Sequence, residues 1–189
     1  MSRVKSIITF CLVAAVAVAA AGSARAVPQY PRDIVATAEV KTEQSSLTSR
    51  VTIHVERLMR EADHERLLAA LKQGGYQAFL PLFRKLAVVG YVELEQRRVD
   101  LRYARVQTTD TGERLILATD GPLYFVSGGA PDAKPRGGYA LSIIDLQFDA
   151  EGGATGTMAA AARVKPGPDG SVVVDDYAEA PIRLTATGR

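Results

Sequence analysis

Apolar and polar residues alternate with a period of two along most of the chain. Val51, Ile53 and Val55 alternate with polar residues, and the same spacing recurs in later segments up to residue 187. A period of two is typical of a strand with one buried face and one exposed face. Turn sequences with glycine or proline separate roughly eight to ten such segments. The pattern therefore predicts a chain rich in β-structure.

One early stretch has the spacing of a helix instead. Four residues share the positions i, i+3, i+4 and i+7 of one helical face: His64, Leu67, Leu68 and Leu71. We expect Asp63 to cap this helix, because its carboxylate can accept the free amides of the first turn. Gly74-Gly75 is expected to end it, and a second helical segment is expected over residues 77–86. Together they predict a helical hairpin at about residues 63–86, inserted between strands.

Two later segments depart from simple alternation. Arg114–Thr119 is apolar on both faces, which predicts a central strand. Within residues 139–148 the apolar positions change phase between Ile143 and Ile144. A change of phase inside one strand predicts a β-bulge there.

These elements predict an α+β fold that is rich in β-structure. The strands follow one another at hairpin spacing, so we expect a mostly antiparallel sheet with one early helical hairpin. The sheet is expected to form a sandwich or a partly closed barrel, and the alternation is compatible with either. We expect one globular domain over residues 27–189.

The first 26 residues have the pattern of a signal peptide. Arg3 and Lys5 precede the uncharged run Ile7–Ala21, and Ala24-Arg25-Ala26 supplies the small residues that a signal peptidase reads. The uncharged run is shorter than the roughly 20 residues that a membrane-spanning helix needs. We therefore expect cleavage after Ala26, export to the periplasm or outside the cell, and no transmembrane segment in the mature chain.

Removing the leader changes the charge of the protein. The full chain carries 23 basic and 21 acidic residues, and residues 1–26 hold three of the bases and none of the acids. The mature chain then has 20 bases against 21 acids, which argues against nucleic-acid binding. Cys11, the one cysteine, lies in the leader, so we expect no disulfide and no cysteine-based zinc site.

The sequence lacks the motifs of the common catalytic and cofactor sites. GxSxG, SxxK and the phosphate-binding GxxxxGK[ST] and GxGxxG motifs are absent. His54 and His64 have no metal-binding spacing, and we interpret both as surface or helix-end residues. The acids Asp175, Asp176 and Glu179 lack the spacing of a calcium loop. We predict no catalytic residue, no metal and no cofactor, and an enzyme is the less favoured interpretation.

One segment is a candidate binding surface. Residues 128–138 have a glycine pair at each end and prolines at 131 and 135, and this connection is longer than usual between neighbouring strands. A stiff loop would hold Asp132, Lys134 and Arg136 away from the sheet, beside Tyr139. We predict that these four residues bind a ligand or partner. The alternative is a surface loop whose prolines prevent pairing at the sheet edge.

Several short motifs carry a resemblance across residues 51–187. They are Val89-Gly90-Tyr91, Leu101-Arg102-Tyr103-Ala104-Arg105, Ala118-Thr119-Asp120, Gly128-Gly129-Ala130-Pro131-Asp132-Ala133-Lys134-Pro135 and Gly156-Thr157-Met158-Ala159-Ala160-Ala161-Ala162. With these motifs the chain resembles uncharacterised exported bacterial proteins. The resemblance implies a bacterial exported protein, and it implies no activity, cofactor or catalytic residue.

The sequence thus favours a non-catalytic exported module that binds a ligand or an envelope protein, or has a structural role in the envelope. Two alternatives remain open. One is an exported hydrolase whose polar site is built from loops, which a deep pocket holding an acid of perturbed pKa would favour. The other is a carrier of apolar ligands, which a large cavity inside a barrel would favour.

Overall fold

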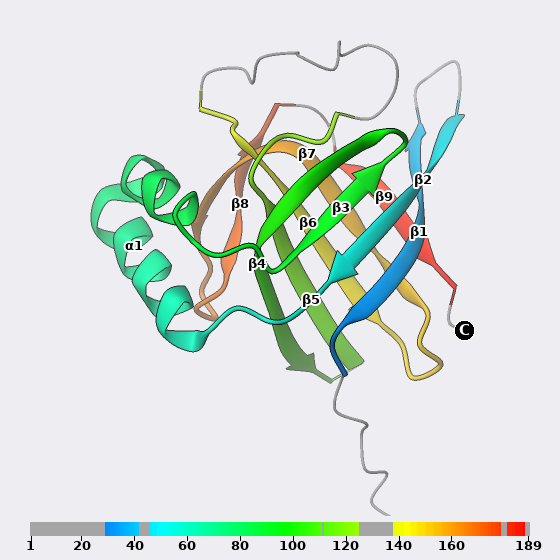
Figure 1. Ribbon diagram of the computed structural model, residues 1–189, viewed down its shortest axis with the longest axis horizontal. Coiled ribbons are helices and arrows are strands. Elements are labelled where there is room, and N and C mark those ends of the chain that lie inside the picture. The colour runs from blue at the N-terminus through cyan, green and yellow to red at the C-terminus, as the bar shows by residue number, and fades with distance from the viewer. Residues whose placement is uncertain (1–28, 42–45, 111, 125–137, 179–180, 188–189) are drawn as a thin grey trace, which may run out of the picture.

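The computed structural model describes residues 29–41, 46–110, 112–124, 138–178 and 181–187. The predicted leader, residues 1–26, lies outside these ranges. Within them the chain forms nine strands and one helix (Figure 1). In chain order the elements are β1 (Arg32–Lys41), β2 (Ser46–Val55), α1 (Glu61–Phe83), β3 (Gly90–Leu94), β4 (Arg97–Thr109), β5 (Gly112–Thr119), β6 (Leu141–Phe148), β7 (Ala154–Pro166), β8 (Val172–Tyr177) and β9 (Ile182–Ala186).

Eight of the strands close into an antiparallel barrel. The order around the barrel is β1-β2-β3-β4-β5-β6-β7-β9, and β9 returns to β1 with Leu184 opposite Ala38. The prediction of a β-rich, mostly antiparallel sheet is confirmed. The sheet is a closed barrel, however, rather than a sandwich or a partly closed barrel. Closure depends on the pairing of the first strand, β1, with the last strand, β9. The alternation of apolar and polar residues within a strand does not predict which other strand it pairs with.

Inward-facing side chains fill the barrel. Strand positions that alternate toward the interior are almost completely buried, among them Ile53, Leu101, Leu115, Leu117 and Ile144. An eight-stranded barrel has an interior just wide enough for such side chains. The interior is therefore a packed hydrophobic core.

A second hydrophobic core lies outside the barrel, where α1 covers the outer face of the wall (Figure 1). Leu67, Leu71 and Phe79 of α1 are buried there with Ile116 of β5 and Ile143 of β6. This packing explains why residues 114–119 are apolar on both faces, because one face lines the barrel and the other is covered. The strand is central, as predicted.

The expected β-bulge lies on a different strand. Residues 141–148 alternate without interruption, with Ile143 in the outer core and Ile144 in the barrel core. The apparent change of phase arises because both faces of β6 are buried. A register shift does occur between Leu141 and Ile143, which face Ala162 and Ala159, so the extra residue is on β7.

The predicted helical hairpin is found in part. α1 is one element with a sharp break at Gly75, where φ is 63° and ψ is −160°, so two helical segments meet without a loop. The helix begins at Glu61 with Arg60 at the N-cap, and no side chain caps it. Asp63 is therefore not the N-cap, and its carboxylate instead accepts a hydrogen bond from Arg60 Nε at 2.7 Å. Across the described residues, every helix falls short of the length and apolarity needed to span a membrane.

Candidate functional site

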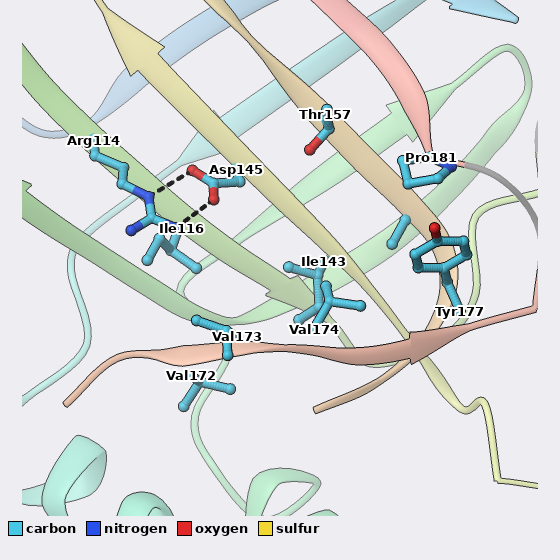
Figure 2. Close-up of a pocket in the computed structure, with 11 residues that line it drawn as sticks. Arg114, Ile116, Ile143, Asp145, Thr157, Val172, Val173, Val174, Tyr177 and Pro181 are labelled. Carbon is cyan, nitrogen blue, oxygen red and sulfur yellow. Dashed lines mark hydrogen bonds and ion pairs between the residues drawn. The ribbon is translucent and has the colours of Figure 1, made fainter. Parts of the chain in front are cut away.

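A pocket of about 200 Å³ lies on the outer face of the barrel, between the wall and β8 (Figure 2). β8 is not one of the eight barrel strands. It pairs only with the end of β7, at residues 162–166, and of these only Ala162 also pairs with β6. The hairpin formed by β7 and β8 leaves the wall here and lies across it. The space between hairpin and wall is the pocket.

The floor and sides of the pocket are apolar. Ile116, Ile143 and Ala159 form the floor, one each from β5, β6 and β7. Val172, Val173 and Val174 of β8 line one side. The pocket is also lined by Pro181 and Tyr177, and Tyr177 lies at its mouth, where it is 45% exposed.

One end of the pocket is polar. Asp145 of β6 lies opposite Ile116 of β5 and opposite Thr157 of β7, so Asp145 and Thr157 share one row of outward-facing positions. Arg114 of β5 lies diagonally across from Asp145, within the reach of a long side chain. These three residues line the pocket beside the apolar floor.

Arg114 is held in one orientation by the groups around it. Its Nε donates to Asp145 Oδ1 at 2.9 Å and its Nη2 donates to Asp145 Oδ2 at 2.6 Å, a bidentate pair. Its Nη1 lies 3.4 Å from Gln107 Oε1 and 3.8 Å from Asp169 Oδ2. The hydrogen bonds with Asp145 raise the pKa of Arg114 above its usual value, so the guanidinium stays charged.

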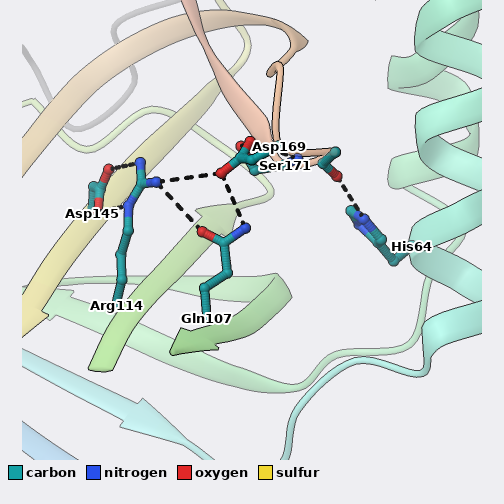
Figure 3. Close-up of polar contacts among 7 residues, drawn as sticks. His64, Gln107, Arg114, Asp145, Asp169 and Ser171 are labelled. Atoms are coloured by element: carbon teal, nitrogen blue, oxygen red, sulfur yellow. Dashed lines mark hydrogen bonds and ion pairs between the residues drawn. The ribbon is translucent and has the colours of Figure 1, made fainter. Parts of the chain in front are cut away.

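Asp169 anchors the turn between β7 and β8 (Figure 3). Its Oδ1 accepts hydrogen bonds from the Ser171 hydroxyl at 2.6 Å and from the Ser171 amide at 3.1 Å. Its Oδ2 accepts one from Gln107 Nε2 of β4 at 3.3 Å. The bonds from Ser171 lower the pKa of Asp169, so this carboxyl is ionised at neutral pH.

His64 fastens the same turn to the helix. Its Nε2 donates to the Gly170 carbonyl at 3.0 Å, and its Nδ1 lies 3.2 Å from the Tyr103 hydroxyl, which therefore donates to it. Burial, followed by the nearby Arg105, lowers the pKa of His64, while burial raises the pKa of Tyr103 to about 12. Of the two interpretations, surface or helix-end residue, His64 fits the second, because it lies in the first turn of α1 and is only 3% exposed. His54 does lie on the outer face, where its Nδ1 pairs with Asp33.

Of the four predicted binding residues, only Tyr139 is described. Asp132, Lys134 and Arg136 lie outside the described residues. The Tyr139 hydroxyl donates to the Asp176 carboxylate of β8, which raises the pKa of Tyr139 and lowers that of Asp176. Tyr139 thus contacts the strand that forms one side of the pocket, although it does not line the pocket.

The residues at the polar end were not singled out from the sequence. A usable signal was present, because Arg114 and Asp145 are charged residues in strands whose other residues are mostly apolar. Such a charge must lie where the outer covering stops. In the described part of the chain, no three His, Cys, Asp or Glu side chains gather as metal ligands.

Comparisons with known proteins give no relative for this chain. Neither a protein-family model, nor a curated protein, nor a solved structure matches it. The resemblance to uncharacterised exported bacterial proteins therefore stays a prediction.

Proposed function

We propose that this protein is a non-catalytic binding module of the bacterial envelope, exported with residues 1–26 as its signal peptide. Its binding site is the pocket between β8 and the barrel wall. One observation carries the proposal: an apolar pocket with a single polar end, built on a rigid sheet, is the usual form of a ligand site.

The size of the pocket indicates what it accepts. A cavity of about 150 Å³ is enough for a benzene molecule, whereas sites for drug-sized ligands start at about 300 Å³. At about 200 Å³ this pocket suits one ring or a short alkyl chain with a small polar group. The group belongs either to a small molecule or to a side chain of an envelope protein.

Two features favour binding over the alternatives. Both oxygens of Asp145, the one acid that lines the pocket, accept hydrogen bonds from Arg114, which leaves this carboxylate as a fixed acceptor. That arrangement supports a binding role more than hydrolysis. The barrel core is filled by side chains, which argues against a carrier that holds its ligand inside the barrel.

The test is a titration with benzyl alcohol, a neutral ring of suitable size. Methyl resonances of Ile143, Ala159 and Val173 should shift together and saturate, and those of the barrel core should not. Val173→Phe should fill the pocket and abolish the shifts. Val88→Phe is the matched control, because Val88 is 37% exposed and lies outside the pocket. Equal binding by both variants would contradict the proposal.

A further inference from the structure

The polar end of the pocket carries more negative than positive charge. Two carboxylates, Asp145 and Asp169, share one guanidinium, that of Arg114, at 2.6 Å and 3.8 Å (Figure 3). The count is two negative charges against one positive charge. Asp145 lines the pocket, and Asp169 lies directly behind Arg114 in the turn before β8.

Three of the five N–H donors of Arg114 are used by hydrogen bonds within the protein. Nε and Nη2 bind Asp145, and Nη1 faces Gln107 and Asp169. An anionic ligand would therefore meet two carboxylates that already pair with the one guanidinium at this end of the pocket. Each Asp145 oxygen, in contrast, accepts one hydrogen bond from Arg114, while a carboxylate accepts about four in all. Asp145 can still accept hydrogen bonds from a ligand.

The other charges nearby do not cancel this excess. Arg183 of β9 lies opposite Thr157, but on its other side it lies opposite Glu39 of β1, which balances it. Asp175 of β8 is paired with Lys165 of β7 at 3.2 Å, so that pair is neutral. Asp176 lies opposite Arg163 in the β7–β8 register, which balances it. At the mouth, the ring of Tyr177 offers an aromatic surface, and such surfaces attract cations.

We infer that the ligand of this pocket is a protonated amine on a small apolar body: the apolar part lies over Ile116, Ile143 and Ala159, and the ammonium group donates to Asp145. The inference rests on the proposed function and names the ligand class of the same site. It applies to a free amine or to an amine-bearing group of a partner.

The test compares three probes with the same ring and different charges: benzylamine, benzyl alcohol and benzoate. At neutral pH and low salt, benzylamine should bind more tightly than benzyl alcohol, and about tenfold more tightly than benzoate, since hydrogen bonds to charged groups are the strong ones. Added salt should reduce the difference. Dissociation constants from the methyl shifts of Ile143 and Ala159 provide the measurement.

Two variants test the two carboxylates separately. Asp145→Asn removes the negative charge that would pair with the ammonium, while its amide oxygen can still accept a hydrogen bond, and should abolish the preference for benzylamine. Asp169→Asn removes one charge behind Arg114, leaves Asp145 in place and should reduce the preference. Asp33→Asn is the control, because it changes the net charge equally but lies on β1, where it pairs with His54 outside the pocket. The control should keep the full preference.

The outcomes distinguish this inference from the proposed function. If none of the three probes binds, the pocket is not a site for small apolar groups, and the proposed function fails with the inference. If all three bind equally, or benzoate binds most tightly, the proposed function stands and the amine inference is overturned. A preference for benzylamine that survives in Asp145→Asn would also overturn it.

Discussion

His64 and Gly170 are 106 residues apart in the sequence, yet His64 Nε2 donates to the Gly170 carbonyl at 3.0 Å. The first residue lies in the first turn of α1, and the second in the turn between β7 and β8. This hydrogen bond joins the helix to the hairpin that forms one side of the pocket. The geometry of the pocket therefore depends on a long-range contact that no local sequence pattern predicts.

The state of His64 predicts how stability depends on pH. Burial lowers the pKa of His64 in the folded protein, whereas in the unfolded chain it is about 6.5. The unfolded state therefore binds the proton first as the pH falls. Neutral His64 therefore contributes to the free energy of unfolding above about pH 6.5. This contribution is lost as the pH falls through the lower pKa that His64 has in the folded protein.

Urea unfolding at several pH values between 7.5 and 5.5 measures this effect. The wild-type protein should lose stability over that range, and His64→Phe should show a smaller loss. Val88→Phe is the control, since it changes an exposed apolar residue and no titratable group, and its pH dependence should match that of the wild type. An identical pH dependence in wild type and His64→Phe would refute the assignment.

Two neighbouring leucines of α1 should differ in their effect on stability. The helical spacing placed Leu67 and Leu68 on one buried face, but Leu67 is 0% exposed and Leu68 is only half-buried and outside both cores. Leu67→Ala should lower the free energy of unfolding by about 2–5 kcal/mol because it leaves a cavity. Leu68→Ala should cost about 1 kcal/mol or less. Chemical denaturation gives both values, and equal losses would contradict this packing.

Gly90 should not tolerate a side chain. It begins β3 with φ at 155°, and a Cβ atom there would lie 2.0 Å from the carbonyl oxygen of His54 on β2. Gly90→Ala should therefore destabilise the barrel by about 3 kcal/mol or disrupt the pairing of β2 with β3. Thermal unfolding measures the loss. In Gly121→Ala the new Cβ would meet Val99 at an ordinary 3.5 Å, so this control should stay near wild-type stability.

Export should remove the leader. If residues 1–26 form a signal peptide, the protein recovered from the periplasm or the medium should have the intact mass of residues 27–189. The motivation is the charged start, the short apolar run and Ala24-Arg25-Ala26. Recovery of the full-length chain in the membrane fraction would be the opposite result.

The sequence by itself determined the type of the secondary structure. Period-two alternation at Val51, Ile53 and Val55 predicts a strand because successive side chains point to opposite faces. The spacing of His64, Leu67 and Leu71 predicts a helix for the equivalent reason, and all three are buried. The apolar character of residues 114–119 on both faces predicts a central strand, and β5 does lie between β4 and β6.

Only the tertiary structure decided how these elements are arranged. Closure requires Leu184 to meet Ala38, and the pocket requires β8 to cross the outer face of the barrel. Arg114, Asp145 and Asp169 come from β5, β6 and the turn before β8, and they meet because the barrel and the hairpin bring these segments together. Alternation reports which face of a strand is buried, not which strand lies beside it. Residues far apart in the chain form a site through long-range pairing, and that pairing is a property of the whole packed core.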